Sequence, residues 1–164
     1  MPQSTCRWAA LSLSNIASVF LPDILLPRGD LATDDILHKL VAVSTTGTSE
    51  RASKWFAKNN IDQDDVSVYY SWQRMLEEGD FDIVYISTPH PLHLEHVRKA
   101  LQCKRNVLVE KPATVTRIQY EWLADYAVKQ NVVLMEAMWV SEVIEHRHIR
   151  DHGSCQYKPT NIPI

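Results

Sequence analysis

Residues 81–110, FDIVYISTPHPLHLEHVRKALQCKRNVLVE, decide the fold. The segment Phe81–Ser87 is mostly apolar or β-branched, which predicts a strand that is buried on both faces. Leu92–Gln102 has apolar residues at helical spacing, and Asn106–Val109 is again a short apolar run. A strand, a helix and a second strand in this order predict a parallel βαβ unit.

The same alternation continues in both directions from this unit. Further strands are predicted at Arg7–Ser12, His38–Thr45, Val66–Tyr70 and Val132–Met135. Helices are predicted at Ile16–Leu26, Ser49–Asn59, Trp72–Gly79 and Thr116–Gln130, with a loop at residues 27–36. Six short strands separated by helices predict an α/β fold, a Rossmann-type doubly wound parallel sheet that binds its ligand beyond the carboxyl ends of the strands.

Two of the predicted helices carry additional signals. In Ser49–Asn59, the side chains of Ala52, Trp55 and Phe56 fall on one face, which we expect to be buried. Ser71 is placed to cap the next helix, and Gly79 is placed to end it in the manner of a C-terminal glycine.

The composition excludes several classes of protein. Of the 164 residues 45% are hydrophobic, and the net charge of −3 is spread along the chain, which argues against nucleic-acid binding and against a membrane surface. Polar residues interrupt the apolar stretch at residues 8–26, so it is not expected to span a bilayer. The three cysteines are far apart and predict free thiols in a reducing, cytoplasmic compartment.

The first strand-to-helix turn would carry the G-x-G-x-x-G/A pattern of a dinucleotide site. It reads Ser12-Leu13-Ser14-Asn15-Ile16-Ala17, in a chain with only four glycines. Ala17 suits close packing of helix on strand, whereas a Cβ at Ser14 would obstruct the approach of a pyrophosphate. Amide groups at the helix terminus remain able to bind an anion. A Rossmann-like turn that binds nothing is the alternative.

The end of the second strand predicts which dinucleotide is preferred. NAD enzymes usually have Asp or Glu here for the ribose hydroxyls, but this chain has hydroxyl side chains, Thr45 and Thr46 among them, followed by Arg51. Hydroxyls and a guanidinium suit a 2′-phosphate, so NADP is favoured over NAD. An ordinary polar turn that caps the next helix is the alternative.

Three spaced motifs point to a known family. They are Ser87-Thr88-Pro89 with His93, then Glu110-Lys111-Pro112, then residues 135–139, which read MEAMW. Over about residues 6–139 the chain resembles the Gfo/Idh/MocA family of glucose–fructose oxidoreductase and inositol dehydrogenase. Within that family it is similar to the branch of dimeric dihydrodiol dehydrogenases and NADP-dependent D-xylose dehydrogenases.

The resemblance implies roles for individual residues. Thr88, Pro89 and His93 would form the loop that lines the riboses of the cofactor. Lys111 would lie by the nicotinamide ribose and the substrate oxygen, with Glu110 helping to hold it. The lysine cation could then orient a hydroxyl and stabilise alkoxide charge while hydride passes between the nicotinamide and a carbinol carbon. The implied substrate is a small molecule, a sugar or a dihydrodiol, and the resemblance also allows a dimer.

The resemblance divides the chain into a dinucleotide-binding domain at residues 1–139 and a tail at 140–164 that departs from the family and is expected to be disordered. The family's second domain, which supplies the substrate pocket and the proton-transferring residue, has no counterpart in the sequence. We therefore expect a truncated chain that is inactive alone. Two alternatives stay open, a non-catalytic module that binds a nucleotide or a partner, and a fragment without stable function.

Histidines outside these motifs are expected to have no functional role. His90 and His96 are predicted to lie on the surface. The tail contains His146, His148, His152 and Cys155, but no predicted element holds them in fixed geometry, so no metal site is expected. Codons for Val140-Ser141 can match a splice donor, which would explain a tail unlike the family.

Overall fold

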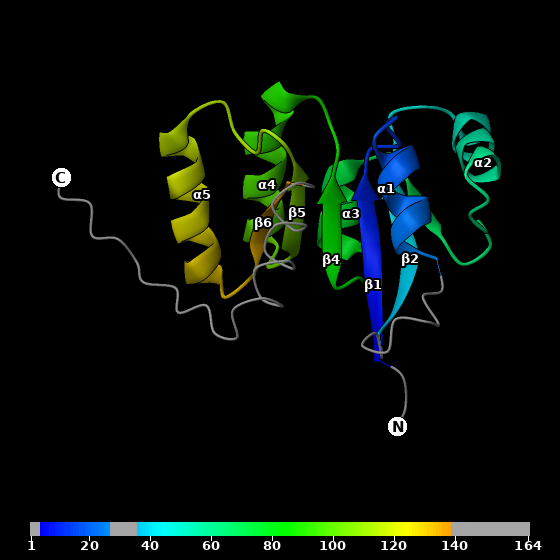
Figure 1. Cartoon of the computed structure of the whole chain (residues 1–164), viewed down its shortest axis with the longest axis horizontal. Coiled ribbons are helices and arrows are strands. Elements are labelled where there is room, and N and C mark those ends of the chain that lie inside the picture. The colour runs from blue at the N-terminus through cyan, green and yellow to red at the C-terminus, as the bar shows by residue number, and fades with distance from the viewer. Residues whose placement is uncertain (1–3, 27–35, 139–164) are drawn as a thin grey trace, which may run out of the picture.

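A computed structural model describes residues 4–26 and 36–138 and shows one six-stranded sheet (Figure 1). All strand pairs are parallel, and the strand order is β3-β2-β1-β4-β5-β6. The strands are β1 (Ser4–Leu11), β2 (Ile36–Ser44), β3 (Ser67–Tyr69), β4 (Ile83–Ile86), β5 (Asn106–Glu110) and β6 (Leu134–Ala137). The predicted doubly wound Rossmann sheet is confirmed.

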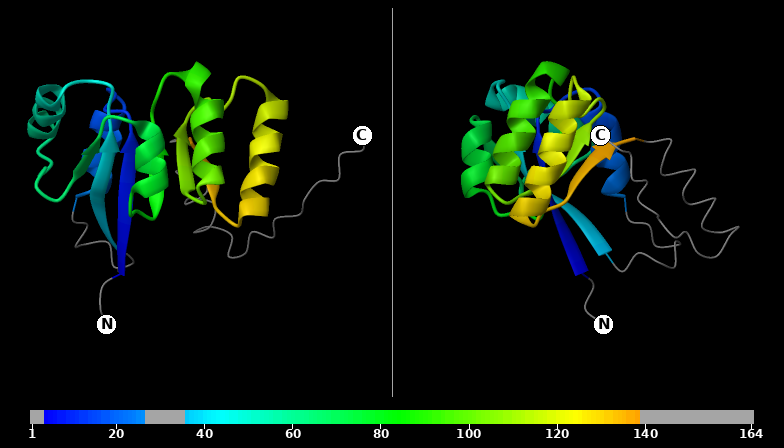
Figure 2. Two further views of the ribbon diagram at one scale, coloured as in Figure 1. Left: turned by 180° about the vertical axis from the view of Figure 1, so that it is seen from behind. Right: turned by 90° about the vertical axis from the view of Figure 1, so that its left-hand side faces the viewer.

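Helices cover both faces of this sheet (Figure 2). On one face lie α1 (Ala17–Ile24) and α2 (Ser49–Lys58). On the other lie α3 (Trp72–Glu78), α4 (His93–Gln102) and α5 (Arg117–Gln130). A short 3₁₀ turn, His90–Leu92, precedes α4, so this helix begins one residue later than predicted.

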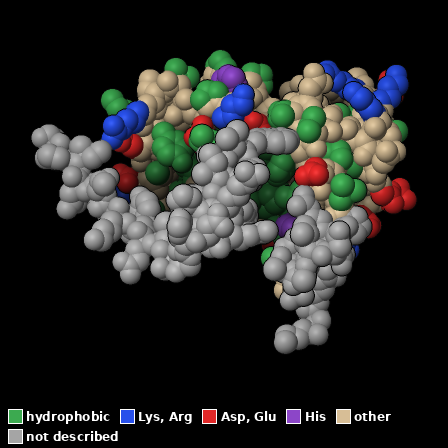
Figure 3. Space-filling view, in the orientation of Figure 1, with side chains coloured by type: hydrophobic (Ala, Val, Ile, Leu, Met, Phe, Trp, Pro, Cys, Tyr) green, Lys and Arg blue, Asp and Glu red, His purple; other side chains and the backbone are tan. Residues whose placement is uncertain are grey.

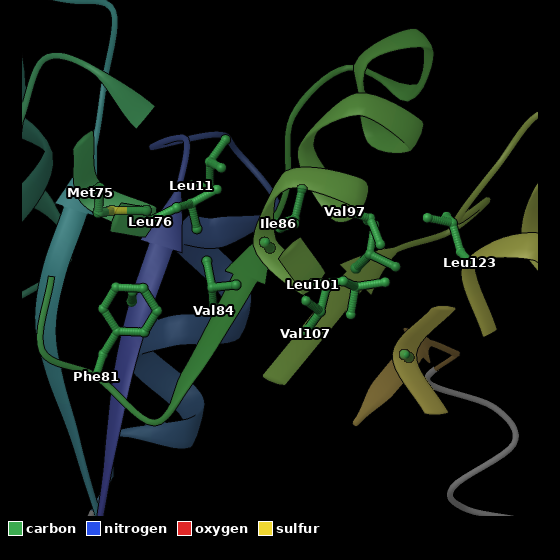
Figure 4. Packing of buried hydrophobic residues seen from close by; sticks show 14 of the residues in the cluster. Leu11, Met75, Leu76, Phe81, Val84, Ile86, Val97, Leu101, Val107 and Leu123 are labelled. Atoms are coloured by element: carbon green, nitrogen blue, oxygen red, sulfur yellow. The ribbon is translucent and has the colours of Figure 1, made fainter. Parts of the chain in front are cut away.

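Successive side chains along the central strands point to opposite faces of the sheet and form two separate hydrophobic cores. Val84 and Ile86 of β4 pack with α3 and α4 (Figure 4). Tyr85, between them in sequence, packs under α1 on the opposite face. Because successive strand side chains point to opposite faces, a nearly continuous apolar run is what a sheet covered on both sides requires. Trp55 and Phe56 are buried with Ala52, as the helical pattern of α2 predicts.

The helix termini follow their capping residues. The hydroxyl of Ser71 accepts a hydrogen bond from the Arg74 amide at the start of α3, and Thr116 forms a capping box with Gln119 at the start of α5. These contacts explain why α3 begins where the sequence predicts and why α5 begins one residue later than predicted, with Thr116 as its cap.

Gly79 ends α3 for a different reason from the one predicted. Its backbone is extended, with φ −68°, and does not take the left-handed conformation of a typical C-terminal glycine. A Cβ at this position would lie 2.6 Å from the carbonyl oxygen of Met75 and 2.7 Å from the Phe81 ring. Close approach, and not backbone freedom, therefore favours glycine here.

Several predictions lie wholly or partly outside the described residues. They include the loop predicted at 27–36 except Ile36, which begins β2, and the tail with its histidines, Trp139 and Cys155. Cys6 and Cys103 are free thiols, each partly buried. None of the helices in residues 4–26 and 36–138 combines the length and apolar character that crossing a bilayer requires.

Candidate functional site

The carboxyl ends of the parallel strands meet at the upper edge of the sheet in Figure 1. The strand order reverses between β1 and β4, and a cleft of about 310 Å³ lies at this switch point. Its lining residues are Leu11, Ser12, Leu13, Ser44, Thr45, Thr46, Arg51, Trp72, Thr88, Pro89, Leu92 and His96. Six predicted site residues are therefore brought together here, namely Ser12, Thr45, Thr46, Arg51, Thr88 and Pro89.

The turn between β1 and α1 keeps the shape of a glycine turn although it has no glycine. Ser12, at the position of the first glycine, has φ 91°, and its amide donates to the carbonyl of Ser44 at 3.0 Å. A positive φ is costly for a residue with a Cβ, so the serine is held there by its surroundings.

Ser14 caps the first helix and does not line the cleft. Its hydroxyl accepts a hydrogen bond from the Ala17 amide at 3.1 Å and lies 2.9 Å from the hydroxyl of Ser87. Ser87 in turn donates to the carbonyl of Ser12 at 3.3 Å. Ala17 is fully buried, as close helix–strand packing requires. Two predicted site residues thus shape the turn from behind the cleft.

The turn nevertheless retains the groups that bind an anion. Within the described ranges, the backbone N–H groups of residues 13–16 have no hydrogen-bond partner. These consecutive amides lie at the N-terminus of α1, where the helix dipole favours negative charge. A phosphate oxygen fits this set of donors.

A second set of donors lies at the start of α2. Thr45 is held by its amide, which donates to Tyr69, and by its hydroxyl, which accepts from Gly47 at 3.1 Å. Thr48 caps the helix by accepting from the Arg51 amide. The Arg51 side chain crosses Gly47, so that a Cβ there would lie 2.8 Å from Arg51 Cδ. None of the described residues that line the cleft is acidic, so this end also suits a phosphate group.

His93 is placed differently from the prediction that it lines the cleft. Its ring is fully buried, with Nε2 2.7 Å from the carbonyl oxygen of Thr88 and Nδ1 2.9 Å from that of Pro112. A side chain enclosed in this way supports the loops around it.

The prediction that His96 lies on the surface is wrong. His96 is buried, its Nδ1 lies 2.9 Å from the Thr88 hydroxyl, and its ring meets Trp72 edge-on at 4.5 Å. Burial lowers the pKa of His96, which therefore carries no charge at pH 7. It falls on the face of α4 that holds Val97 and Ala100, and this helical spacing is the signal that could have found it. His90 is exposed, as predicted.

Lys111 lies in a separate cleft of about 660 Å³, lined by Ile16, Val19, Lys111, Pro112, Glu136, Ala137 and Met138. The side chain of Lys111 is exposed, and its peptide bond to Pro112 is cis. Hydrophobic side chains reach the surface on the face that carries α1 (Figure 3). Among the described residues, the lining of this second cleft is mostly apolar, with two charged side chains, Lys111 and Glu136.

Glu110 does not hold Lys111 in the way the resemblance implies. Its carboxylate is buried and accepts a hydrogen bond from the Tyr85 hydroxyl at 2.6 Å. In the part of the chain that the structure describes, no hydrogen bond or ion pair joins Glu110 to Lys111. Glu136, which the sequence analysis missed, holds the loop after Lys111 by accepting from the Ala113 amide at 2.8 Å.

Metal chemistry finds no support in this region. Among the described residues, no group of three His, Cys, Asp or Glu side chains could hold a metal ion. The histidines of the tail lie outside those residues.

Comparisons with known proteins agree with this geometry. Residues 13–138 match the Gfo/Idh/MocA family model, described as an oxidoreductase family with an NAD-binding Rossmann fold. D-xylose 1-dehydrogenase (NADP(+)) of Hypocrea jecorina is 35% identical over 82% of this chain and 34% of its own length. Trans-1,2-dihydrobenzene-1,2-diol dehydrogenase of Xenopus tropicalis is 31% identical over 81% of this chain and 37% of its own length. The chain thus spans about a third of these curated relatives.

A solved structure shares the fold. It is KijD10, a 3-ketoreductase from Actinomadura kijaniata, in complex with NADP and TDP-benzene. The match has a TM-score of 0.71 and 25% sequence identity, and it covers 90% of this chain and 42% of KijD10.

Proposed function

The chain belongs to the Gfo/Idh/MocA oxidoreductase family with its NAD-binding Rossmann fold, and on that premise we propose that it is the NADP-binding part of an oxidoreductase. The proposed reaction is hydride transfer with the CH–OH group of a sugar or dihydrodiol. The named activities of the xylose and dihydrodiol dehydrogenases support this substrate class.

One observation carries the proposal. The cleft at the switch point of the sheet has phosphate-binding groups at two places. Thr45, Thr46 and Arg51 line one side, and Ser12 and Leu13 line another, where the turn with the amides of residues 13–16 begins. A dinucleotide with a pyrophosphate and a 2′-phosphate carries anions at two such places. The residues present therefore fit NADP.

The preference for NADP over NAD follows from charge. The 2′-phosphate adds negative charge where NAD has a hydroxyl, and Arg51 provides a cation beside two threonine hydroxyls. With no carboxylate among the lining residues, the adenosine ribose of NAD lacks its usual acceptor. NADP bound to KijD10 and the name of the xylose dehydrogenase support the same cofactor.

Lys111 is the residue that we assign to the chemistry. The cofactor, when bound, supplies the nicotinamide carbon that exchanges hydride. The exposed ammonium of Lys111, at the edge of the second cleft, would donate a hydrogen bond to the substrate oxygen and stabilise negative charge that develops there. Pro112 and Ala137 on the same cleft would exclude water from that contact.

The second candidate is a nucleotide-binding module that docks on a partner and has no turnover of its own. Exposed apolar residues that line the second cleft with Lys111 favour this module. The side chain of Val19 is 54% exposed and that of Met138 is 48% exposed, and Ile16 lines the same cleft. Dimerisation stays a prediction from the resemblance, which gel filtration of the purified chain would test.

Two measurements separate the candidates. Titration of the chain with NADPH, followed by nicotinamide fluorescence, measures cofactor binding. Incubation with NADP and D-xylose or a dihydrodiol, followed by absorbance of NADPH, measures turnover. Binding with turnover supports the oxidoreductase, and binding without turnover supports the module. Absence of binding contradicts both.

A further inference from the structure

We propose that His93 is a positioning residue that couples the two clefts, because its two ring nitrogens face the loop of Thr88 and the loop of Lys111. The coupling between the two ends of a bound dinucleotide rests on the proposed function. The bridge, by which we mean the contacts of His93 with the Thr88 and Pro112 carbonyls, rests on the structure of the chain itself. Neither the family match nor any relative's name assigns this role.

Both ring nitrogens of His93 face backbone carbonyl oxygens. Nε2 lies 2.7 Å from that of Thr88, and Nδ1 lies 2.9 Å from that of Pro112. Since a carbonyl oxygen only accepts, each contact needs an N–H on the ring. A ring with one N–H can serve one carbonyl at a time, whereas a ring with two serves both. The ring is fully buried, so water does not replace either bond.

The two acceptors belong to different clefts. Thr88 and Pro89 line the first cleft with Thr45 and Arg51. Pro112 lines the second, next to Lys111. Within the described residues, no other side-chain hydrogen bond joins residues 87–92 with residues 111–114. We therefore expect that a displacement of one loop displaces the other through the imidazole of His93.

Two conservative substitutions can cut one bond each. The amide nitrogen of Asn lies close to the position of Nδ1, so H93N can keep the Pro112 bond and lose the Thr88 bond. The amide nitrogen of Gln reaches the position of Nε2, so H93Q can keep the Thr88 bond and lose the Pro112 bond. His90 is the control, because its ring lies 5.5 Å from the His93 ring but is exposed.

The first test compares amide NMR spectra of the free proteins. H93Q should shift the signals of Lys111 and Ala113 while leaving Thr88 in place, H93N should do the reverse, and H90Q should move neither loop. A purely structural role would move both loops together. The same pattern in H93N and H93Q, or no change in either, would overturn the bridge.

The second test measures ligand binding. Adenosine 2′,5′-bisphosphate probes the first cleft alone, and NADPH spans both. In H93Q the affinity for the bisphosphate should stay within twofold while that for NADPH falls about tenfold, the value of one buried hydrogen bond. In H93N both ligands should bind about tenfold more weakly, because the Thr88 loop serves both. Equal weakening of both ligands in H93Q would overturn the coupling.

Measurements on the wild-type chain decide the matter if the variants do not fold. The ring protons of His93 should show through-space NMR contacts to both Thr88 and Pro112, and the lack of either contact would overturn the bridge. Addition of adenosine 2′,5′-bisphosphate should shift the amide signals of Lys111 and Ala113. Binding without that shift would overturn the coupling. If the wild type binds neither nucleotide, the proposed function fails, and the spectra of the free proteins still test the bridge.

Discussion

The Tyr85 hydroxyl donates a hydrogen bond to Glu110 Oε1 at 2.6 Å, which fixes the residue directly before Lys111 from inside the sheet. Tyr85 is fully buried and packs against Phe20 of α1, with ring centroids 4.5 Å apart. Burial raises the pKa of Tyr85, and the hydrogen bond to Glu110 raises it further. The hydroxyl therefore stays protonated and keeps its role as the donor.

Removal of this hydroxyl should destabilise the chain. Y85F leaves the Glu110 carboxylate buried without its donor, which costs about 1–3 kcal/mol of the free energy of unfolding. Urea unfolding followed by tryptophan fluorescence measures the change. Tyr70 is exposed, so Y70F should change the free energy by less than about 0.5 kcal/mol. If Y85F changed the free energy of unfolding as little as Y70F, the Tyr85–Glu110 hydrogen bond would not contribute to stability.

Glycine at position 12 should stabilise the protein. Ser12 has φ 91°, a conformation that glycine adopts without strain, so S12G is expected to raise the free energy of unfolding by about 1 kcal/mol. The control is S53G in the exposed interior of α2, where glycine should lower stability by a similar amount. Thermal melting of both variants shows whether stability rises in S12G and falls in S53G. A loss of stability in S12G would contradict the strain at this turn.

Alanine at position 79 should be poorly tolerated. A Cβ there would lie 2.6 Å from a backbone oxygen and 2.7 Å from an aromatic ring, so G79A should cost about 1–3 kcal/mol. At Gly47 the closest atom to a new Cβ is Arg51 Cδ, at the flexible end of a side chain, and G47A should cost less. Chemical unfolding of the pair measures the difference. Equal losses of unfolding free energy in G79A and G47A would show that the backbone around Gly79 accommodates a Cβ as easily as the loop at Gly47.

Stability should fall on mild acidification because of His96. Burial lowers the pKa of His96 in the folded chain, while the unfolded value is near 6.5. Below pH 6.5 the unfolded chain binds the proton first, so the His96 contribution is complete above pH 6.5 and is lost as pH falls towards the folded pKa. The nearby charge of Glu95 opposes this shift, and His93 adds to it.

Melting temperatures between pH 5 and 7.5 measure this dependence. H96Q should lose part of the slope that the wild type shows, since glutamine does not titrate. H90Q removes an exposed histidine and should retain the wild-type slope. A slope in H96Q equal to that of the wild type would show that other groups carry the acid sensitivity.

The cation at the start of α2 should control the preference for NADP. R51Q removes the guanidinium from the cleft and should weaken NADPH about tenfold or more, with little effect on NADH. Lys54 is exposed on the same helix and does not line the cleft, so K54Q should bind both within about twofold of wild type. Fluorescence titration of the wild type and the two variants with NADPH and with NADH gives the six affinities. A similar loss in K54Q would indicate a general effect of charge.

Much of the fold could be predicted because its signal is local. The apolar run at Phe81–Ser87 and the capping serine Ser71 act within a few residues of themselves, and both predictions are confirmed. The end of β2 and the turn at Ser12 could also be placed in one cleft, since carboxyl ends of parallel strands share an edge.

The supporting contacts could not be predicted because they join distant segments. His93 meets a carbonyl that lies 19 residues away in sequence, and Tyr85 meets a carboxylate 25 residues away. The motif that contains His93 indicates that this residue has a role, but it does not indicate that the ring is buried behind the cleft. The reason predicted for Gly79 was wrong although its contacts are local, because the closeness of the Met75 carbonyl and the Phe81 ring follows from the folded backbone and not from the residue pattern.

The most direct test of the central claim is a calorimetric titration of the wild-type chain with NADP and with NAD under the same conditions. We expect saturable binding of one NADP per chain, with NAD at least about tenfold weaker because it lacks the phosphate that Arg51 would bind. Equal or tighter binding of NAD would contradict the assignment of the 2′-phosphate to Arg51. No binding of either dinucleotide would contradict the site itself.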